Sequence, residues 1–262
     1  MTLNIAHRGG AALWPENTLA AFADAIASGC DGAELDVQLS RDGAVVVHHD
    51  FRLMADVARK GGAWLDELGP RIKDLSLAEL RQFDVGHPQP GSSYAQAHPL
   101  LTPVDAAIPT LAEVIALAKA APRPFDLLVE LKCDASADSA DPVALADAAY
   151  DVAAAEGFLS SVIFVGFDWR ALARIRRRGA PCWFTTDRLA GDARPVIDAI
   201  AKADGQGWFA HFADASPQSV NFARSKSLKV GAWTVNSVAD MERLKGLDAL
   251  CTDRPDLLAS LF

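Results

Sequence analysis

Three acidic residues occur inside apolar runs of the sequence, where an unpaired charge is energetically costly. Glu34 and Asp36 are separated by one residue, and Glu130 lies in a second apolar run. Because residues two apart on a strand face the same side, Glu34 and Asp36 should present both carboxylates to one surface. Three oxygen ligands suit one divalent cation, Mg²⁺ or Ca²⁺ with Mn²⁺ as a third candidate, and do not suit zinc. Ion pairing with Arg8 and Lys132 is the other interpretation, and the two can coexist.

Two histidines also follow apolar runs, so their imidazoles are expected at strand ends. They are His7 and His49. Hydrolysis of a phosphodiester needs a base for the attacking oxygen and an acid for the leaving alkoxide. Imidazoles titrate near neutral pH and suit both tasks, and the sequence leaves open which one is the acid. His48 competes with His49, but neighbours on a strand face opposite ways, so only one of them is expected in the site.

Further side chains could bind a phosphate or an alcohol. Lys132 shares a strand face with Glu130 and could hold phosphate oxygens. The guanidinium of Arg8 also suits phosphate, although in a regular strand it should face away from His7. Trp233, near the end of a later apolar run, either packs against the alcohol part of a substrate or fills the interior of the fold.

The segment after the first apolar run leads into a helix expected from residue 19. Asn17 is a candidate for the N-cap of this helix. The preceding residue, Glu16, is expected to hydrogen-bond into the site through its neighbours.

Short apolar runs alternate with helix-like stretches along most of the chain. Eight runs are expected to be strands, at residues 3–7, 32–37, 127–132, 162–167, 181–185, 207–212, 229–235 and 249–252. Near-continuous hydrophobic runs are typical of parallel strands buried on both faces. Helix start signals lie between them, such as Asp141 and the capping box from Thr110 to Glu113. Eight strands and eight helices in one α/β chain predict a TIM (β/α)8 barrel.

One connection breaks this alternation. The acidic strand at 32–37 and the next apolar run at 44–49 are joined only by a short link at 40–43. A parallel crossover needs about a dozen residues or more, so the link must be a hairpin turn. The second strand of the TIM barrel should therefore extend past the rim and return, which would place His49 near Glu34 and Asp36.

A long insertion follows, at about residues 51–109. It is rich in glycine and proline and carries one clear helix signal at 76–79. A loop this long in a compact domain usually has a function. Because it leaves from the rim, we expect it to form a cap over the site; the alternative is an insertion with no catalytic role. Residues 1–262 as a whole are expected to be a single domain.

The charge and apolar content exclude some classes of protein. The chain has 262 residues and a formal net charge of −9, whereas nucleic-acid binders normally carry a basic stripe. The one dense basic run, at 174–178, is interpreted as the solvated end of a helix. No apolar run approaches the roughly 18 residues of a membrane-spanning helix, and strand-like sequence begins by Leu3. We therefore expect no signal peptide, no stable membrane insertion and a cytoplasmic protein; a homo-oligomer is compatible with the sequence.

The pattern as a whole resembles the glycerophosphodiester phosphodiesterase family. The matching motifs are His-Arg-Gly at 7–9, Pro-Glu-Asn-Thr at 15–18, Glu-x-Asp at 34–36, His-Asp at 49–50, Glu-Leu-Lys at 130–132, Trp-Thr-Val-Asn at 233–236 and Thr-Asp-Arg-Pro at 252–255. They occur in the family's order and span nearly the whole chain. The sequence departs from the family pattern at 51–54 and 165–168, around the expected substrate pocket, which leaves the identity of the alcohol open.

The resemblance implies a metal-dependent hydrolase that cleaves a small glycerophosphodiester to sn-glycerol 3-phosphate and an alcohol. By similarity, the residue roles would be metal binding by Glu34, Asp36 and Glu130, acid and base catalysis by His7 and by His49 rather than His48, and phosphate contact by Lys132. A phospholipase C- or D-like phosphodiesterase or lyase is one alternative, and a non-catalytic phosphodiester-binding protein is another. The native metal, and whether water or a substrate hydroxyl attacks, are left open.

Overall fold

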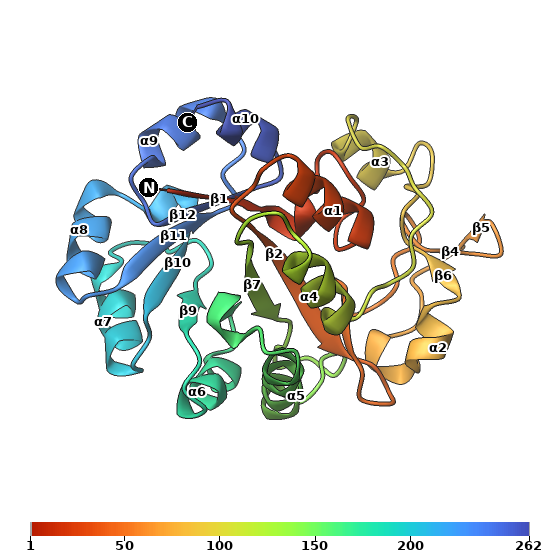
Figure 1. The fold of residues 1–262 in the computed structure, drawn as a ribbon, viewed down its shortest axis with the longest axis horizontal. Helices are drawn as coiled ribbons and strands as arrows, with labels where there is room; N and C mark the ends of the chain where they lie inside the picture. The colour runs from red at the N-terminus through yellow and green to blue at the C-terminus, as the bar shows by residue number, and fades with distance from the viewer. Residues whose placement is uncertain (1, 262) are drawn as a thin grey trace.

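The computed structural model describes residues 2–261, and eight parallel strands of this part of the chain close into a barrel (Figure 1). Their bounds are β1 (Leu3–Ala6), β2 (Gly32–Leu39), β7 (Asp126–Leu131), β8 (Val162–Gly166), β9 (Cys182–Thr185), β10 (Gly207–His211), β11 (Lys229–Trp233) and β12 (Ala249–Thr252). The barrel closes because β1 pairs with both β12 and β2. The prediction of a TIM barrel is confirmed.

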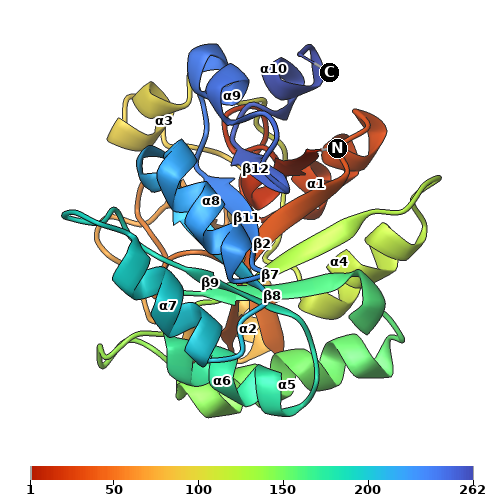
Figure 2. The same cartoon turned by 90° about the vertical axis from the view of Figure 1, so that its left-hand side faces the viewer.

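One helix follows each barrel strand and packs on its outer side (Figures 1 and 2). The helices are α1 (Leu19–Ala27), α4 (Leu111–Lys119), α5 (Pro142–Ala155), α6 (Trp169–Arg177), α7 (Arg194–Lys202), α8 (Pro217–Ser225), α9 (Val238–Leu244) and α10 (Pro255–Ala259). The predicted helix N-termini are confirmed: Asp141 caps α5, and Thr110 and Glu113 form a capping box on α4. Short 3₁₀ turns lie at η1 (His7–Gly9), η2 (Ile72–Asp74), η3 (Leu159–Ser161) and η4 (Phe212–Asp214).

The apolar side chains form separate cores. The large core lies between the strands and the surrounding helices. A second, smaller cluster fills the inside of the barrel, and it includes Ile5, Leu128 and Phe209. The strands are therefore apolar on both faces, which explains the near-continuous hydrophobic runs of the sequence.

The predicted hairpin after β2 is present. β3 (Val45–Val47) pairs antiparallel with the end of β2, with Val37 opposite Val47. Gly43, at a φ of 81°, supplies the left-handed conformation that this turn requires. On its return the chain reaches the level of the acidic strand, where the backbone N–H of His48 donates to the carbonyl of Asp36 at 2.9 Å.

The insertion has secondary structure of its own. Its elements are β4 (Arg59–Lys60), β5 (Ala63–Trp64), α2 (Leu77–Leu80), β6 (Phe83–Asp84) and α3 (Ser93–Ala97). It has a small apolar core that is distinct from the core of the barrel, and it lies beside α1, β2 and α4 in Figure 1. Arg52 of this segment pairs with Asp138 in the loop after β7 at 2.7 Å. Thr102 donates to the carbonyl of Leu13, in the loop after β1, at 2.8 Å. The insertion therefore contacts loops at the carboxyl-terminal rim of the barrel.

Arginines at the end of α6 form ion pairs with a neighbouring helix. Arg174 and Arg178 both pair with Asp147 of α5, at 2.7 Å and 3.2 Å. These pairs support the interpretation of a solvated helix end. No helix among the described residues is long and apolar enough to cross a membrane.

The four cysteines are buried and form no disulfide bonds. Burial raises the pKa of Cys30, Cys133 and Cys182 to about 12. These thiols are therefore protonated at neutral pH and unreactive.

Candidate active site

The three predicted acidic residues meet at the rim of the barrel. Glu34, Asp36 and Glu130 are only 2%, 2% and 8% exposed, and each offers a carboxylate oxygen within 4.8 Å of the others. They converge because β2 and β7 are neighbours, with Asp36 directly opposite Glu130 in the register. The Oε1 atom of Glu34 is buried and has no hydrogen-bond partner among residues 2–261. An unpaired buried oxygen beside two other carboxylates fits a divalent cation with oxygen ligands.

The carboxyl groups of this cluster differ in the direction in which their pKa is shifted. Burial, together with the charges of Asp36 and Glu130, raises the pKa of Glu34 well above its ordinary value. Burial also favours the neutral form of Asp36, but the charges of Arg8 and His49 outweigh it and hold the pKa of Asp36 well below its ordinary value. The charge of Asp36 is thus compensated by cations of the protein, whereas the charge of Glu34 is compensated only in part, by Arg8.

Arg8 does not face away from His7, so that prediction is wrong. The strand ends at Ala6, and the chain turns through η1 with Arg8 itself at a φ of 51°. The side chain of Arg8 consequently reaches Asp36, with Nε 3.3 Å from Oδ2, while its backbone N–H donates to Glu34 at 3.2 Å. The alternation of a strand does not apply inside a 3₁₀ turn.

Glycine is required in the same turn. Gly9 has a φ of 86°, and a Cβ at this position would lie 2.6 Å from the Cβ of Ala21 in α1. A side chain here would push the turn away from the helix, and the turn carries both His7 and Arg8.

The side chain of Lys132 lies beside the acidic cluster, as predicted. Its Nζ atom is 2.8 Å from Oε1 of Glu130 and 3.7 Å from Oδ1 of Asp36. Burial opposes the charge of Lys132, but these two carboxylates outweigh it and raise its pKa above the ordinary value. The ion pairs and the potential metal site thus coexist in one cluster.

The imidazole of His7 is held by Asp253, a residue of the Thr-Asp-Arg-Pro motif at 252–255. Its Nδ1 atom lies 2.6 Å from Oδ1 of Asp253, and its Nε2 atom lies 3.8 Å from Oε2 of Glu34. The other oxygen of Asp253 accepts from Nδ2 of Asn236 at 2.6 Å. Burial favours the neutral form of Asp253, but the hydrogen bond with His7 outweighs it and lowers the pKa of Asp253. Asp253 is therefore an ionised partner that orients the imidazole of His7.

His49 lies on the return of the hairpin, and its Nδ1 atom is 3.0 Å from Oδ1 of Asp50. The backbone of this return is fixed by Gln38, whose Nε2 atom lies 2.8 Å, 3.2 Å and 2.8 Å from the carbonyls of His48, His49 and Asp50. Gln38 continues the alternate positions of Glu34 and Asp36 along β2, a signal from which the sequence could have identified it.

His48 occupies a different environment from His49. Its Nε2 atom is buried without a partner in the described part of the chain, and burial lowers its pKa. The choice of His49 over His48 for catalysis stays a prediction.

Asn17 is not the N-cap of α1, so that prediction is also wrong. Thr18 caps the helix, accepting from the backbone N–H of Ala21 at 3.2 Å. Asn17 has a φ of 57°, and this conformation turns its amide toward the barrel. There, Nδ2 donates to Oδ2 of Asp36 at 2.8 Å and Oδ1 accepts from the backbone N–H of Asp36 at 3.2 Å. Asn17 therefore orients a residue of the acidic cluster.

Trp233 lies at the end of β11 in a small group of aromatic rings. Its ring centroid is 5.4 Å from Phe167 and 5.6 Å from His211, both in edge-to-face geometry. The ring of Phe167 in turn lies 5.9 Å from Nζ of Lys132. Trp233 also packs against the apolar interior of the barrel. The indole N–H is buried with no acceptor among residues 2–261, so Trp233 fills space and also offers an unused donor.

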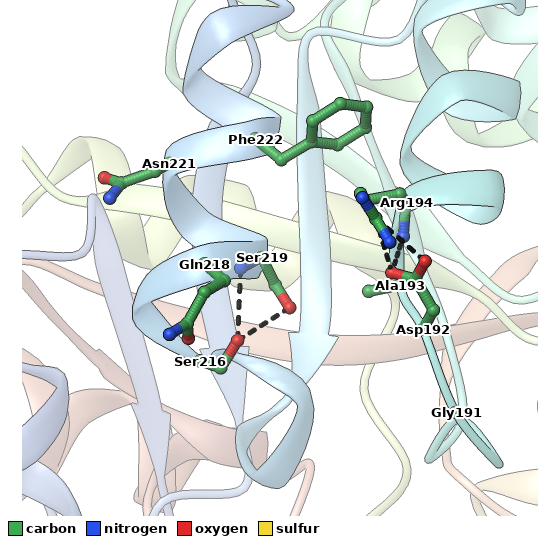
Figure 3. A pocket seen from close by; sticks show the side chains of 9 residues that line it. All are labelled: Gly191, Asp192, Ala193, Arg194, Ser216, Gln218, Ser219, Asn221 and Phe222. Carbon is green, nitrogen blue, oxygen red and sulfur yellow. Dashed lines mark hydrogen bonds and ion pairs between the residues drawn. The ribbon is translucent and has the colours of Figure 1, made fainter.

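The structure also has a hollow that does not coincide with this cluster. A space of about 810 Å³ lies between the start of α7 and the first turns of α8 (Figure 3). Four of the side chains that line it are paired with one another: Arg194 with Asp192 at 2.8 Å, and Ser216 with Ser219 at 2.9 Å. Within the described part of the chain, the residues that line it include none of the predicted site residues. The chemistry lies at the acidic cluster instead.

A TIM barrel with three buried carboxylates, two histidines and two cations at its carboxyl-terminal rim has the arrangement of a barrel enzyme's active site, and its carboxylates could hold a metal ion. Comparison with known proteins specifies the family. Residues 7–257 match the model of the glycerophosphoryl diester phosphodiesterase family. The chain therefore belongs to this family and is an enzyme of it.

Individual relatives agree with this assignment. The glycerophosphodiester phosphodiesterase of Caldanaerobacter subterraneus subsp. tengcongensis is 29% identical, over 99% of this chain and 97% of the relative. Among solved structures, a glycerophosphoryl diester phosphodiesterase-type protein from Silicibacter pomeroyi DSS-3 superposes with a TM-score of 0.88 at 29% identity, covering 98% of this chain and 92% of the other. A phosphodiesterase from Oleispira antarctica, solved with its product sn-glycerol-3-phosphate, superposes with a TM-score of 0.75 at 26% identity, covering 98% and 94% of the two chains.

Proposed function

We propose that this enzyme hydrolyses glycerophosphodiesters to sn-glycerol 3-phosphate and an alcohol, and that it uses one divalent cation. The observation that carries the proposal is the buried carboxylate cluster, in which Oε1 of Glu34 has no partner among the described residues. The product bound in the Oleispira antarctica phosphodiesterase supports the choice of substrate.

The residues that would hold the cation are Glu34, Asp36 and Glu130, and Mg²⁺, Ca²⁺ and Mn²⁺ all prefer such oxygen ligands. When bound, the cation would neutralise charge on the phosphate and polarise its oxygens. Lys132 and Arg8 lie beside this cluster and would bind the remaining phosphate oxygens, because those oxygens carry negative charge.

The two imidazoles would move the protons. His7 and His49 would serve as acid and base, in an order that the proposal leaves open. The base removes a proton from the attacking oxygen, either of water or of a substrate hydroxyl, as that oxygen bonds to phosphorus. The bond from phosphorus to the alcohol oxygen then breaks, and the acid protonates the alkoxide. Attack by water gives sn-glycerol 3-phosphate directly. Attack by a substrate hydroxyl gives a cyclic phosphate, and water must then add to phosphorus and open the ring to form sn-glycerol 3-phosphate. Asp253 would hold His7 through Nδ1, which leaves Nε2 free for this proton transfer.

The glycerol and alcohol parts of the substrate would occupy different surroundings. Phe167 lies near Lys132, and Trp233 packs against Phe167; both rings would pack against carbon atoms of the substrate. The insertion at 51–109 contacts the loops after β1 and β7, and these contacts support the proposal that it would cover the outward-facing alcohol as a cap within a single domain. The cytoplasmic location and the oligomeric state stay predictions.

Product analysis tests the proposed function. Purified protein would be incubated with glycerophosphocholine, glycerophosphoethanolamine and glycerophosphoglycerol under Mg²⁺, Ca²⁺ or Mn²⁺, and products followed by ³¹P NMR. We expect sn-glycerol 3-phosphate with at least one substrate. A cyclic phosphate as the final product would indicate a lyase, and cleavage only of lipid phosphodiesters would indicate a phospholipase. Binding without turnover would indicate a non-catalytic protein.

A further inference from the structure

The side chain of Tyr94 in α3 connects the insertion to the site. Its hydroxyl donates to Oε2 of Glu16 at 3.2 Å, across 78 positions of sequence. The other oxygen of Glu16, Oε1, accepts from Nη1 of Arg8 at 3.0 Å. Nε of the same guanidinium lies 3.3 Å from Asp36 in the acidic cluster. A continuous series of polar contacts thus joins the insertion to the candidate metal site.

The Tyr94 end of this series is held by several contacts. The ring of Tyr94 stacks on His98, with centroids 4.2 Å apart, and Nδ1 of His98 donates to the carbonyl of Tyr94 at 2.9 Å. A backbone hydrogen bond from Thr102 to Leu13, at 2.8 Å, attaches the same part of the insertion to the loop that carries Glu16. Tyr94 therefore approaches Glu16 from a rigid position.

The middle of the series is largely shielded from water, since the side chains of Glu16 and Arg8 are only 17% and 19% exposed. Hydrogen bonds to a shielded charge are stronger than those at an open surface. Each oxygen of the Glu16 carboxylate has one partner, so the hydroxyl of Tyr94 fixes the rotation of this carboxylate. That rotation in turn fixes where the guanidinium of Arg8 points. Glu16 lies outside the acidic cluster, so its bond to Arg8 does not compete for a ligand of the cation.

We propose that Tyr94 is a positioning residue for phosphate binding, acting through Glu16 on the guanidinium of Arg8. This inference rests on the proposed function and extends it: the insertion takes part in assembling the phosphate site, in addition to covering the alcohol. It follows that the phosphate contact of Arg8 depends on a hydroxyl of the insertion, outside the barrel itself.

The test compares two tyrosine variants. The chain has only two tyrosines, and the hydroxyl of the second, Tyr150, donates to the carbonyl of Arg178 at 3.1 Å, at the end of α6. Tyr94→Phe should raise KM with little change in kcat, lowering kcat/KM by about tenfold, the size expected for loss of one hydrogen bond to a charged group. Tyr150→Phe removes an equivalent hydroxyl and should leave both constants unchanged.

Two further measurements separate positioning from a general loss of structure. Divalent-cation affinity of the metal-stripped protein, by calorimetry, should be the same in Tyr94→Phe and the wild type. The double variant Tyr94→Phe with Glu16→Gln should have a KM no higher than that of Glu16→Gln alone, because both substitutions interrupt the same series of hydrogen bonds. Additive losses, or an unchanged KM in Tyr94→Phe, would overturn the proposal.

Failure of the positioning role of Tyr94 can be distinguished from failure of the proposed function. If the wild-type protein hydrolyses none of the three glycerophosphodiesters, the proposed function is wrong. Binding of inorganic phosphate in the presence of Mg²⁺ then decides the role of Tyr94. About tenfold weaker phosphate binding in Tyr94→Phe supports the positioning role, and equal binding refutes it.

Discussion

His7 and Asp253 are joined by a 2.6 Å contact between Nδ1 and Oδ1, although 246 positions separate them in the sequence. β1 and β12 are neighbours in the barrel, with Ala6 opposite Thr252 in the register, so the residues that follow these two strands meet. A carboxylate can only accept a hydrogen bond, so Nδ1 of His7 carries a proton. The neutral tautomer consequently has its free nitrogen at Nε2, on the side of Glu34.

Replacement of Asp253 should therefore reduce catalysis without removing the catalytic imidazole. In Asp253→Asn the amide can donate to Nδ1, which would shift the proton of His7 to Nε2. We expect kcat to fall on the order of 10²-fold, within the range of general acid–base catalysis, with unchanged metal affinity. Single-turnover kinetics and metal calorimetry check this, and wild-type kcat in Asp253→Asn would show that His7 does not depend on this partner.

The three histidines at the site should differ in importance. His7→Ala and His49→Ala should each lose about 10²–10⁴-fold in kcat while remaining folded. His48→Ala should retain activity close to that of the wild type, because the Nε2 atom of His48 is buried and so is not accessible to a substrate. Steady-state kinetics with circular dichroism as a folding control measure this. An inactive His48→Ala together with an active His49→Ala would reverse the assignment.

Metal removal should abolish activity. EDTA treatment is expected to inactivate the enzyme, and Mg²⁺, Ca²⁺ or Mn²⁺ should restore it, because Glu34, Asp36 and Glu130 form an all-oxygen site. Glu34→Ala should lose both metal binding and activity. The insertion offers a matched control in Asp105, which belongs to another acidic cluster but pairs with Arg59 at 2.8 Å; Asp105→Asn should change neither. Full activity of the metal-stripped enzyme would exclude the proposed site.

His48 should make the stability of the protein depend on pH. Burial lowers its pKa below the ordinary value of 6.5, so the unfolded chain takes up this proton more readily than the folded protein does. The contribution to stability is complete above pH 6.5 and is lost as the pH falls from 6.5 toward the folded pKa. The Tm should therefore drop between pH 7.5 and pH 5, and drop less in His48→Gln. Equal decreases in the two proteins would show that His48 does not contribute.

The insertion should determine which alcohol is preferred. Shortening residues 51–109 in a variant that still folds should change the ratios of kcat/KM among glycerophosphocholine, glycerophosphoethanolamine and glycerophosphoglycerol. Specificity is a difference in transition-state contacts, and metal affinity should stay unchanged because the three carboxylates lie on β2 and β7. Identical ratios in the shortened and full-length proteins would mean that the insertion does not contact the alcohol.

Much of the fold follows from local sequence patterns. The apolar runs predict the eight barrel strands, and the shortness of the link at 40–43 predicts the hairpin that brings His49 back to the rim. The spacing of Glu34 and Asp36 predicts that both carboxylates share a face. These predictions succeed because strand periodicity, helix capping and minimum connection lengths depend only on residues close in sequence.

Other features could be decided only by the tertiary structure. Arg8 and Asn17 both adopt positive φ angles. Because neither is a glycine, the sequence gives no sign of this conformation and indicates a regular strand at Arg8 and a helix N-cap at Asn17. Asp253 reaches the site from the end of the neighbouring strand β12, and Tyr94 reaches it from the insertion. The sequence by itself determined the barrel and the acidic strand face. The orientation of His7 and the placement of Arg8 depend on turns and on contacts between distant segments, which form only when the barrel closes.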